Sequence, residues 1–138
     1  MNKTAMELQK NIVVALARSI EEPWERIVVN YEVQDEDGGQ TEDRRGFTVI
    51  PDGTGDYRKG QLTFDTTVKD LFRELRAEIQ RSEGQGWGTC DLVIDKPGRF
   101  RFNFSYDPPK RINGVFDEQS MGRFDRYLET YKAERAGT

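Results

Sequence analysis

Residues 87–107 have the sequence WGTCDLVIDKPGRFRFNFSYD, in which apolar and polar side chains alternate over two runs. This alternation is typical of strands that bury one face. Between the runs, Lys96-Pro97-Gly98 favours a turn, because proline presets the first bend and glycine tolerates positive φ. Asp107-Pro108-Pro109 then ends sheet pairing, since proline has no N–H to donate. The stretch therefore predicts a β-hairpin.

The two sides of this hairpin have different predicted roles. The inward side is expected to be core and comprises Cys90, Leu92, Ile94, Phe100, Phe102, Phe104 and Tyr106. Together with the first strand of the chain, the outward side would present Arg26, Asn30, Glu32, Asp91, Asp95, Arg99, Arg101 and Asn103. That outward face is either a solvated surface or a polar docking surface. Trp87, at the start of the hairpin, is either a core residue or an interface anchor.

The residues before the hairpin predict a helix followed by two strands. Apolar residues recur every fourth position from about Thr4 to Ile20, which favours an amphipathic helix that Pro23 ends. Arg26 to Val33 alternates as a half-buried strand does, and residues 35–39 are rich in turn formers. A second, antiparallel strand is therefore expected over residues 45–49.

Two more helices complete the predicted order. Residues 51–60 are expected to form an irregular loop, because glycine and proline recur among polar residues. A second helix should begin at residues 65–67, which can cap free N–H groups, and extend to about Ile79. A last helix should begin between Asp117 and Gly122 and end near Glu134. The fold class predicted is α+β: a single domain with a four-stranded antiparallel sheet, helices on one face, and the order α-β-β-α-β-β-α.

Composition limits the classes of protein to which the chain can belong. The 138 residues suit one domain, and no stretch approaches the roughly 18–20 apolar residues of a membrane span, so a cytoplasmic protein without membrane contact is expected. A single cysteine, Cys90, cannot form an internal disulfide, and without histidine it cannot build a structural zinc site.

The formal net charge of -4 arises in the first half of the chain. Residues 1–60 contain 8 Lys/Arg and 12 Asp/Glu, whereas residues 61–138 contain 13 of each. The acids are densest between Glu32 and Asp43. An acidic domain repels phosphate backbones, so direct nucleic-acid binding is disfavoured. The acidic stretch is either a solvated loop or a surface for a basic protein.

Residue types that support catalysis are scarce. The absence of histidine excludes Ser-His and Cys-His arrangements, and no GxxxxGK[ST] loop is present. Cys90 lies on the inward side of a predicted strand, where cysteine behaves as a small hydrophobe. The pairs Asp91/Asp95 and Asp117/Glu118 are what chance provides in a chain with 25 acids. We therefore expect no enzyme, no metal and no cofactor.

Four motifs occur in order along the chain: Trp24-Glu25-Arg26-Ile27, Asp70-Leu71-Phe72-Arg73-Glu74-Leu75-Arg76, Trp87-Gly88-Thr89-Cys90, and Phe100 to Asp107. In this order and spacing the chain resembles the YezG-like family of immunity proteins over roughly Leu8 to Asp107. These antitoxins protect bacteria from their own secreted polymorphic toxins, many of which are nucleases. Ser105 departs from the family pattern, in which an acid precedes the tyrosine, and since it faces outward it bears on partner identity rather than on fold.

The resemblance implies inhibition of a cognate toxin domain by complex formation inside the producing cell. The residues themselves suggest an interface only through exposure and charge, and the candidates are Asp35, Glu36, Asp37, Arg101, Asp107, Asp117 and Glu118. Acidic charge would complement a basic nuclease. The alternative function is a protein-interaction adaptor or subunit unrelated to toxin immunity. The oligomeric state stays open.

Overall fold

The computed structural model describes residues 1–137. Its strands form one antiparallel five-stranded sheet in the order β3-β2-β1-β4-β5. The elements are α1 (Lys3–Arg18), β1 (Arg26–Glu36), β2 (Gly39–Pro51), β3 (Tyr57–Gln61), α2 (Thr66–Glu83), β4 (Thr89–Asp95), β5 (Arg99–Ser105), the single π-helical turn η1 (Glu118–Gly122), α3 (Arg123–Asp125) and α4 (Tyr127–Ala136). No helix in this part of the chain is long and apolar enough to cross a membrane.

The hairpin predicted within residues 87–107 is confirmed as β4 and β5, but Tyr106, which was expected in the core, lies beyond β5 and is 37 % exposed. Its register places Leu92 opposite Phe102 and Ile94 opposite Phe100. The β4 side chains of this face are fully buried under α1 and α2, whereas the three phenylalanines of β5 are half-buried, because β5 is the edge strand. Trp87 is a core residue: it is fully buried, and its ring packs on Tyr31 and Phe104.

The prediction of four strands is wrong, because the second half of the expected loop, residues 51–60, belongs to a fifth strand, β3 (Tyr57–Gln61). This strand pairs with β2 and places Gly60 opposite Thr48. A Cβ atom at Gly60 would lie 2.3 Å from the hydroxyl of Thr48 and 2.4 Å from the side chain of Ile50. Glycine is thus required here by a close approach within the sheet, although in the sequence it resembles a turn residue.

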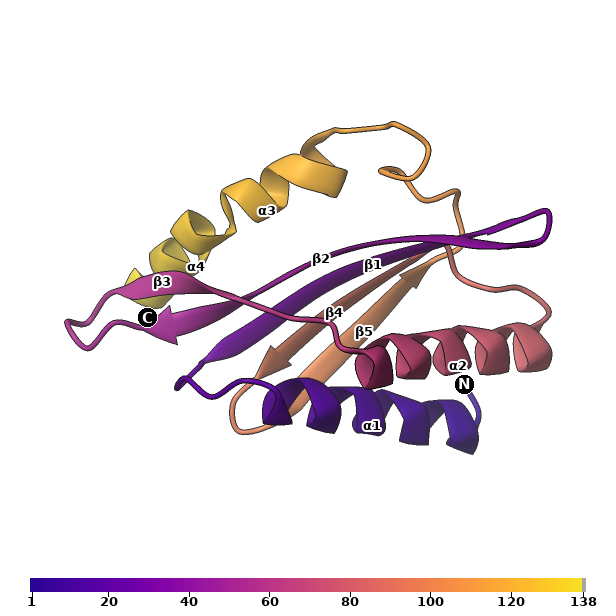
Figure 1. Cartoon of the computed structure of the whole chain (residues 1–138). Coiled ribbons are helices and arrows are strands. Elements are labelled where there is room, and N and C mark those ends of the chain that lie inside the picture. The colour runs from indigo at the N-terminus through magenta and orange to yellow at the C-terminus, as the bar shows by residue number, and fades with distance from the viewer. Residues whose placement is uncertain (138) are drawn as a thin grey trace.

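The expectation that helices cover only one face is also wrong. In Figure 1, α1 and α2 lie below the sheet, and α3 and α4 lie above β1, β2 and β3. Phe47 and Val49 point to this upper face, where they pack with Val28, Phe124 and Tyr131 in a second apolar cluster. The central strand β1 is therefore buried on both sides over Ile27 to Val33. The observed order is α-β-β-β-α-β-β followed by η1 and two short helices.

Both strands of the first hairpin are longer than predicted. Glu36 pairs with Gly39, so the turn shrinks to Asp37 and Gly38. Gly38 has a φ of +84°, which glycine adopts without steric cost. The acidic residues 35–37 are therefore at the tip of a fully paired hairpin that projects beyond the rest of the sheet (Figure 1).

Candidate protein-binding surface

A C-terminal segment, residues 107–122, crosses the upper face of the sheet and is fastened there by Arg111. The Arg111 guanidinium is buried and donates from Nε to Asp43 at 2.6 Å and from Nη1 to Asn30 at 2.6 Å. It lies 3.2 Å from the carboxylate of Glu32, which is only 2 % exposed. Glu32 also accepts hydrogen bonds from the backbone N–H groups of Arg111 and Ile112, at 3.2 and 3.0 Å.

This anchor corrects the prediction of a solvated or docking surface at Asn30 and Glu32. Both side chains point to the upper face as expected, but each is 2 % exposed because the C-terminal segment covers it. The buried charges are tolerated here because the Glu32 carboxylate accepts two backbone hydrogen bonds and the Arg111 guanidinium donates to Asp43 and Asn30. The outward side of β5 alone, at Arg99, Arg101 and Asn103, is exposed as predicted.

A second set of contacts fixes the shape of the same segment. Asp117 caps η1 by accepting from the N–H of Ser120 at 2.9 Å, and Lys110 donates to it at 2.6 Å. The Lys110 contact and the Ser120 N–H lower the pKa of Asp117 to about 2. Asn113 donates to Gln34 at 2.7 Å, which ties the segment to β1 just before the acidic hairpin tip.

The fold brings the hairpin tip and this segment to the same end of the molecule (Figure 1). We call this surface, formed by residues 35–37 and 106–118, the acidic end. Within residues 1–137, the exposed carboxylates of Glu36, Asp37 and Asp107 have no ion-pair partner. Phe116 belongs to the same surface through residues 106–118 and is 66 % exposed, more than any other large apolar side chain described. An exposed aromatic ring within a charged surface is typical of protein interfaces.

Three of the predicted interface residues have structural contacts as well. Asp117 is the cap of η1, Glu118 forms an ion pair with Arg126, and Asp35 accepts two hydrogen bonds from Arg76, at 2.8 and 3.1 Å. Arg101 is exposed on the outward side of β5, away from the acidic end. The structure thus gathers six of the seven candidates at one end and leaves Arg101 outside.

Asp35 anchors the hairpin to α2. Its partner Arg76 is 5 % exposed and also donates to the carbonyl of Trp87 at 2.6 Å. The hydrogen bonds from Arg76 lower the pKa of Asp35 below its ordinary value of 3.8. The role of Asp35 is therefore to hold the tip in place, while Glu36 and Asp37 face solvent.

This pairing predicts a pH dependence for Asp35→Asn. Because the pKa is lower in the folded chain, the ion pair contributes stability above the unfolded pKa and loses it as the pH falls. At pH 7 the variant should unfold at lower urea concentration than the native chain, and the difference should shrink as the pH falls below about 4. Glu74→Gln, an exposed helical control, should keep the native pH profile; a constant difference at all pH values would contradict this role for Asp35.

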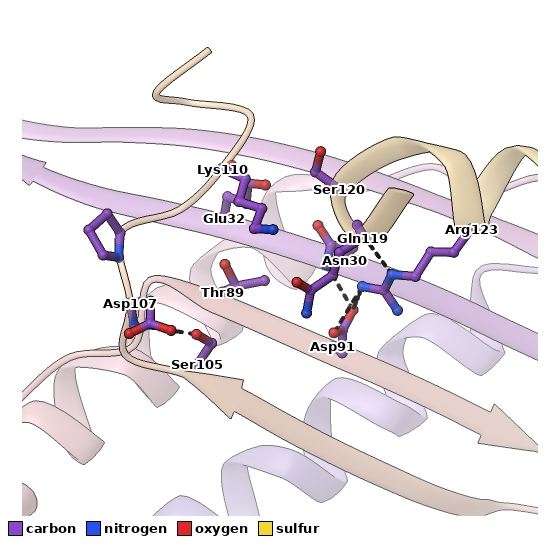
Figure 2. A pocket seen from close by; sticks show the side chains of 11 residues that line it. Asn30, Glu32, Thr89, Asp91, Ser105, Asp107, Lys110, Gln119, Ser120 and Arg123 are labelled. Atoms are coloured by element: carbon purple, nitrogen blue, oxygen red, sulfur yellow. Dashed lines mark hydrogen bonds and ion pairs between the residues drawn. The ribbon is translucent and has the colours of Figure 1, made fainter. Parts of the chain in front are cut away.

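A small polar cavity of about 100 Å³ lies beneath the segment, between it and strands β1, β4 and β5. Figure 2 shows Asp91, Ser105, Asp107, Lys110 and Arg123 around it. Arg123 donates to both oxygens of Asp91 at 3.0 Å, so the carboxylate that was a catalytic candidate is neutralised. Ser105 also lines this cavity.

The described residues offer no arrangement that would hold a metal. No group of three Asp, Glu, Cys or His side chains converges within residues 1–137. Cys90 is fully buried, and this burial raises the pKa of its thiol well above the ordinary value, so the thiolate is disfavoured.

Arg111 is the residue of this surface that the sequence did not indicate. It follows two prolines in an irregular stretch, and no periodic pattern includes it. The only available signal was indirect: Asn30 and Glu32 interrupt an apolar strand, so a polar partner was needed on that face.

No protein-family model matches this chain, and no curated protein matches it by sequence. Function is therefore inferred from the charges, the exposure and the packing of its own residues.

Proposed function

We propose that this chain is an immunity protein, an antitoxin that binds and neutralises a cognate secreted bacterial toxin with a basic surface, of the nuclease kind. The observation that carries the proposal is the acidic end, where unpaired carboxylates and the exposed ring of Phe116 lie on a rigid support. The resemblance to YezG-like immunity proteins points to the same function.

The charges of the acidic end suit recognition of a basic domain. Glu36 and Asp37 occupy the end of a hairpin, and Asp107 begins the segment that carries Phe116. Carboxylates without an ion-pair partner in their own chain can pair with lysine and arginine of a partner and increase the rate of encounter. A nuclease must attract phosphate, so its active region carries basic residues of that kind.

Rigidity supports the proposal as well. The hairpin tip is tied to α2 through Asp35 and Arg76, and the C-terminal segment is tied to the sheet through Arg111 and Asn113. Binding then costs little conformational entropy, because these parts are ordered before the partner arrives. Inhibition by occupation of the toxin requires no catalytic residue in the inhibitor.

Co-expression tests this function. The toxin domain encoded beside the gene of this chain is produced in a bacterial host with and without the chain, and survival is measured. We expect survival only with the chain, and much reduced survival with Glu36→Lys/Asp37→Lys. The double reversal Glu7→Lys/Glu74→Lys, at exposed helical positions, should protect as the native chain does.

Growth arrest despite soluble expression of the native chain would contradict neutralisation. The absence of a toxin gene in the neighbourhood would also count against immunity and in favour of an adaptor for another basic protein.

A further inference from the structure

Strand β5 is a free edge of the sheet. It pairs with β4 on one side, and no described strand lies on the other. Backbone N–H and C=O groups on a free edge can pair with a strand of another chain. Residues 99–105 are therefore a potential site of strand addition.

The side chains of β5 differ in character between the two faces of the sheet. Phe100, Phe102 and Phe104 are half-buried on the face that α1 covers. Arg99 and Arg101 are exposed on the opposite face, and neither has an ion-pair partner within residues 1–137. Asp95, which lies opposite Arg99, is already bound by Arg26 at 2.6 Å. The edge thus carries apolar area on one side and unpaired positive charge on the other.

An apolar groove adjoins the first end of β5. It lies between α1 and the turn of the second hairpin and has a volume of about 430 Å³. Val13, Val14, Trp24, Ile94 and Phe100 contribute to its walls, and Val14 is 45 % exposed. A partner strand that runs along β5 would place a side chain next to Phe100, at this groove.

We propose that β5 pairs with β5 of a second copy of this chain, antiparallel and with its two-fold axis at Asn103. In this register, Arg101 lies opposite Ser105 of the second copy, and Arg99 lies opposite its Asp107. On the other face, Phe102 meets Phe104 and Phe100 meets Tyr106. Residues 106 and 107 follow β5 but lie outside the strand, and Asp107 is at the bend where the chain leaves the sheet.

Complementarity selects a second copy as the partner. The Asn103 register places no like charges directly opposite each other, and it supplies the acid that Arg99 lacks within its own chain. It also brings Tyr106, 37 % exposed, to the apolar groove beside Phe100. Centring the pair on Phe102 instead would place Arg99 opposite Ser105 and leave Asp107 opposite Pro97.

The dimer and the proposed toxin-binding surface share one residue, Asp107. A two-fold axis at Asn103 joins the two sheets edge to edge and places the two hairpin tips at opposite ends. Glu36, Asp37 and Phe116 stay accessible in each copy, whereas Asp107 is engaged at the dimer interface.

Charge reversal and restoration test the register. The mass of the full chain in solution is measured by sedimentation equilibrium over a range of concentrations, without toxin. We expect a dimer whose dissociation constant rises about tenfold in Arg99→Asp and in Asp107→Arg, since each creates two like-charge pairs per dimer. The double variant should recover the native constant. Eight residues of extended chain, about 26 Å, separate the two positions within one copy, so recovery must arise between copies.

Cross-linking gives a second, fold-independent readout. Asn103→Cys should form a symmetric disulfide under mild oxidation, whereas Gln61→Cys on the opposite edge strand should not; Cys90 is buried in both. A chain that stays monomeric at all concentrations would overturn the proposal. A dimer whose dissociation constant is the same in both charge-reversal variants would also overturn it. So would protection of β5 from hydrogen exchange only when toxin is bound.

Discussion

Replacement of Arg111 by methionine is expected to lower the free energy of unfolding by about 3–5 kcal/mol, the effect of leaving one member of a buried ion pair without its partner. The carboxylate of Glu32 is 2 % exposed, so the loss of the guanidinium leaves a buried charge without its ion-pair partner. Asn30 and Asp43 lose their hydrogen bonds at the same time. Urea unfolding followed by circular dichroism measures the change.

Arg18→Met provides the control for this prediction. Arg18 is exposed at the end of α1 and, in the described part of the chain, has no ion-pair partner, so its loss should cost less than about 1 kcal/mol. A cost for Arg111→Met as small as that of the control would show that Arg111 does not anchor the C-terminal segment.

The second large effect concerns Phe116. Its side chain is 66 % exposed, so Phe116→Ala should leave the stability of the chain nearly unchanged. In a complex, a buried aromatic anchor contributes about 2 kcal/mol or more, and its loss should weaken toxin binding about 30-fold, mostly through faster dissociation. Surface plasmon resonance with the immobilised toxin domain measures both rates.

Met6→Ala is the matched control for Phe116→Ala. Met6 is 51 % exposed on α1, outside the acidic end, and its truncation should leave both rates as they are. By contrast, Glu36→Lys/Asp37→Lys should slow association most strongly at low salt, because electrostatic steering is screened as ionic strength rises. Equal affinity of the native chain and Phe116→Ala would place the interface elsewhere.

Much of the fold follows from periodicity in the sequence. The alternation from Cys90 to Phe104 indicated β4 and β5 because one face of each strand is apolar. The strand β3 escaped prediction because Gly60, which is required by the side chains of Thr48 and Ile50, has the appearance of a turn residue. A close approach between two strands cannot be predicted from a local sequence pattern.

The second apolar cluster was missed for a related reason. Phe47 and Val49 were predicted to alternate within a strand, but the sequence does not state which face of the sheet a given helix covers. The face is determined by tertiary packing, here by Phe124 and Tyr131 of the C-terminal helices. Helices on both faces then explain why the consecutive residues Ile27, Val28 and Val29 of β1 are all apolar and buried.

The candidate surface was predicted in part. Charge density identified Glu36 and Asp37, and both are exposed and unpaired within residues 1–137. Asp35, next to them, is held by Arg76 across 41 positions of the chain, a contact that no local pattern contains. Its predicted role at the interface is therefore less direct than that of its neighbours.

The most direct test of the central proposal is a titration of the purified toxin domain with this chain, with toxin turnover as the readout. We predict complete loss of turnover at an equimolar amount of chain, and a requirement for at least tenfold more of the Phe116→Ala or Glu36→Lys/Asp37→Lys variant at low protein concentration. Undiminished turnover at a large molar excess of the folded native chain would contradict the proposal.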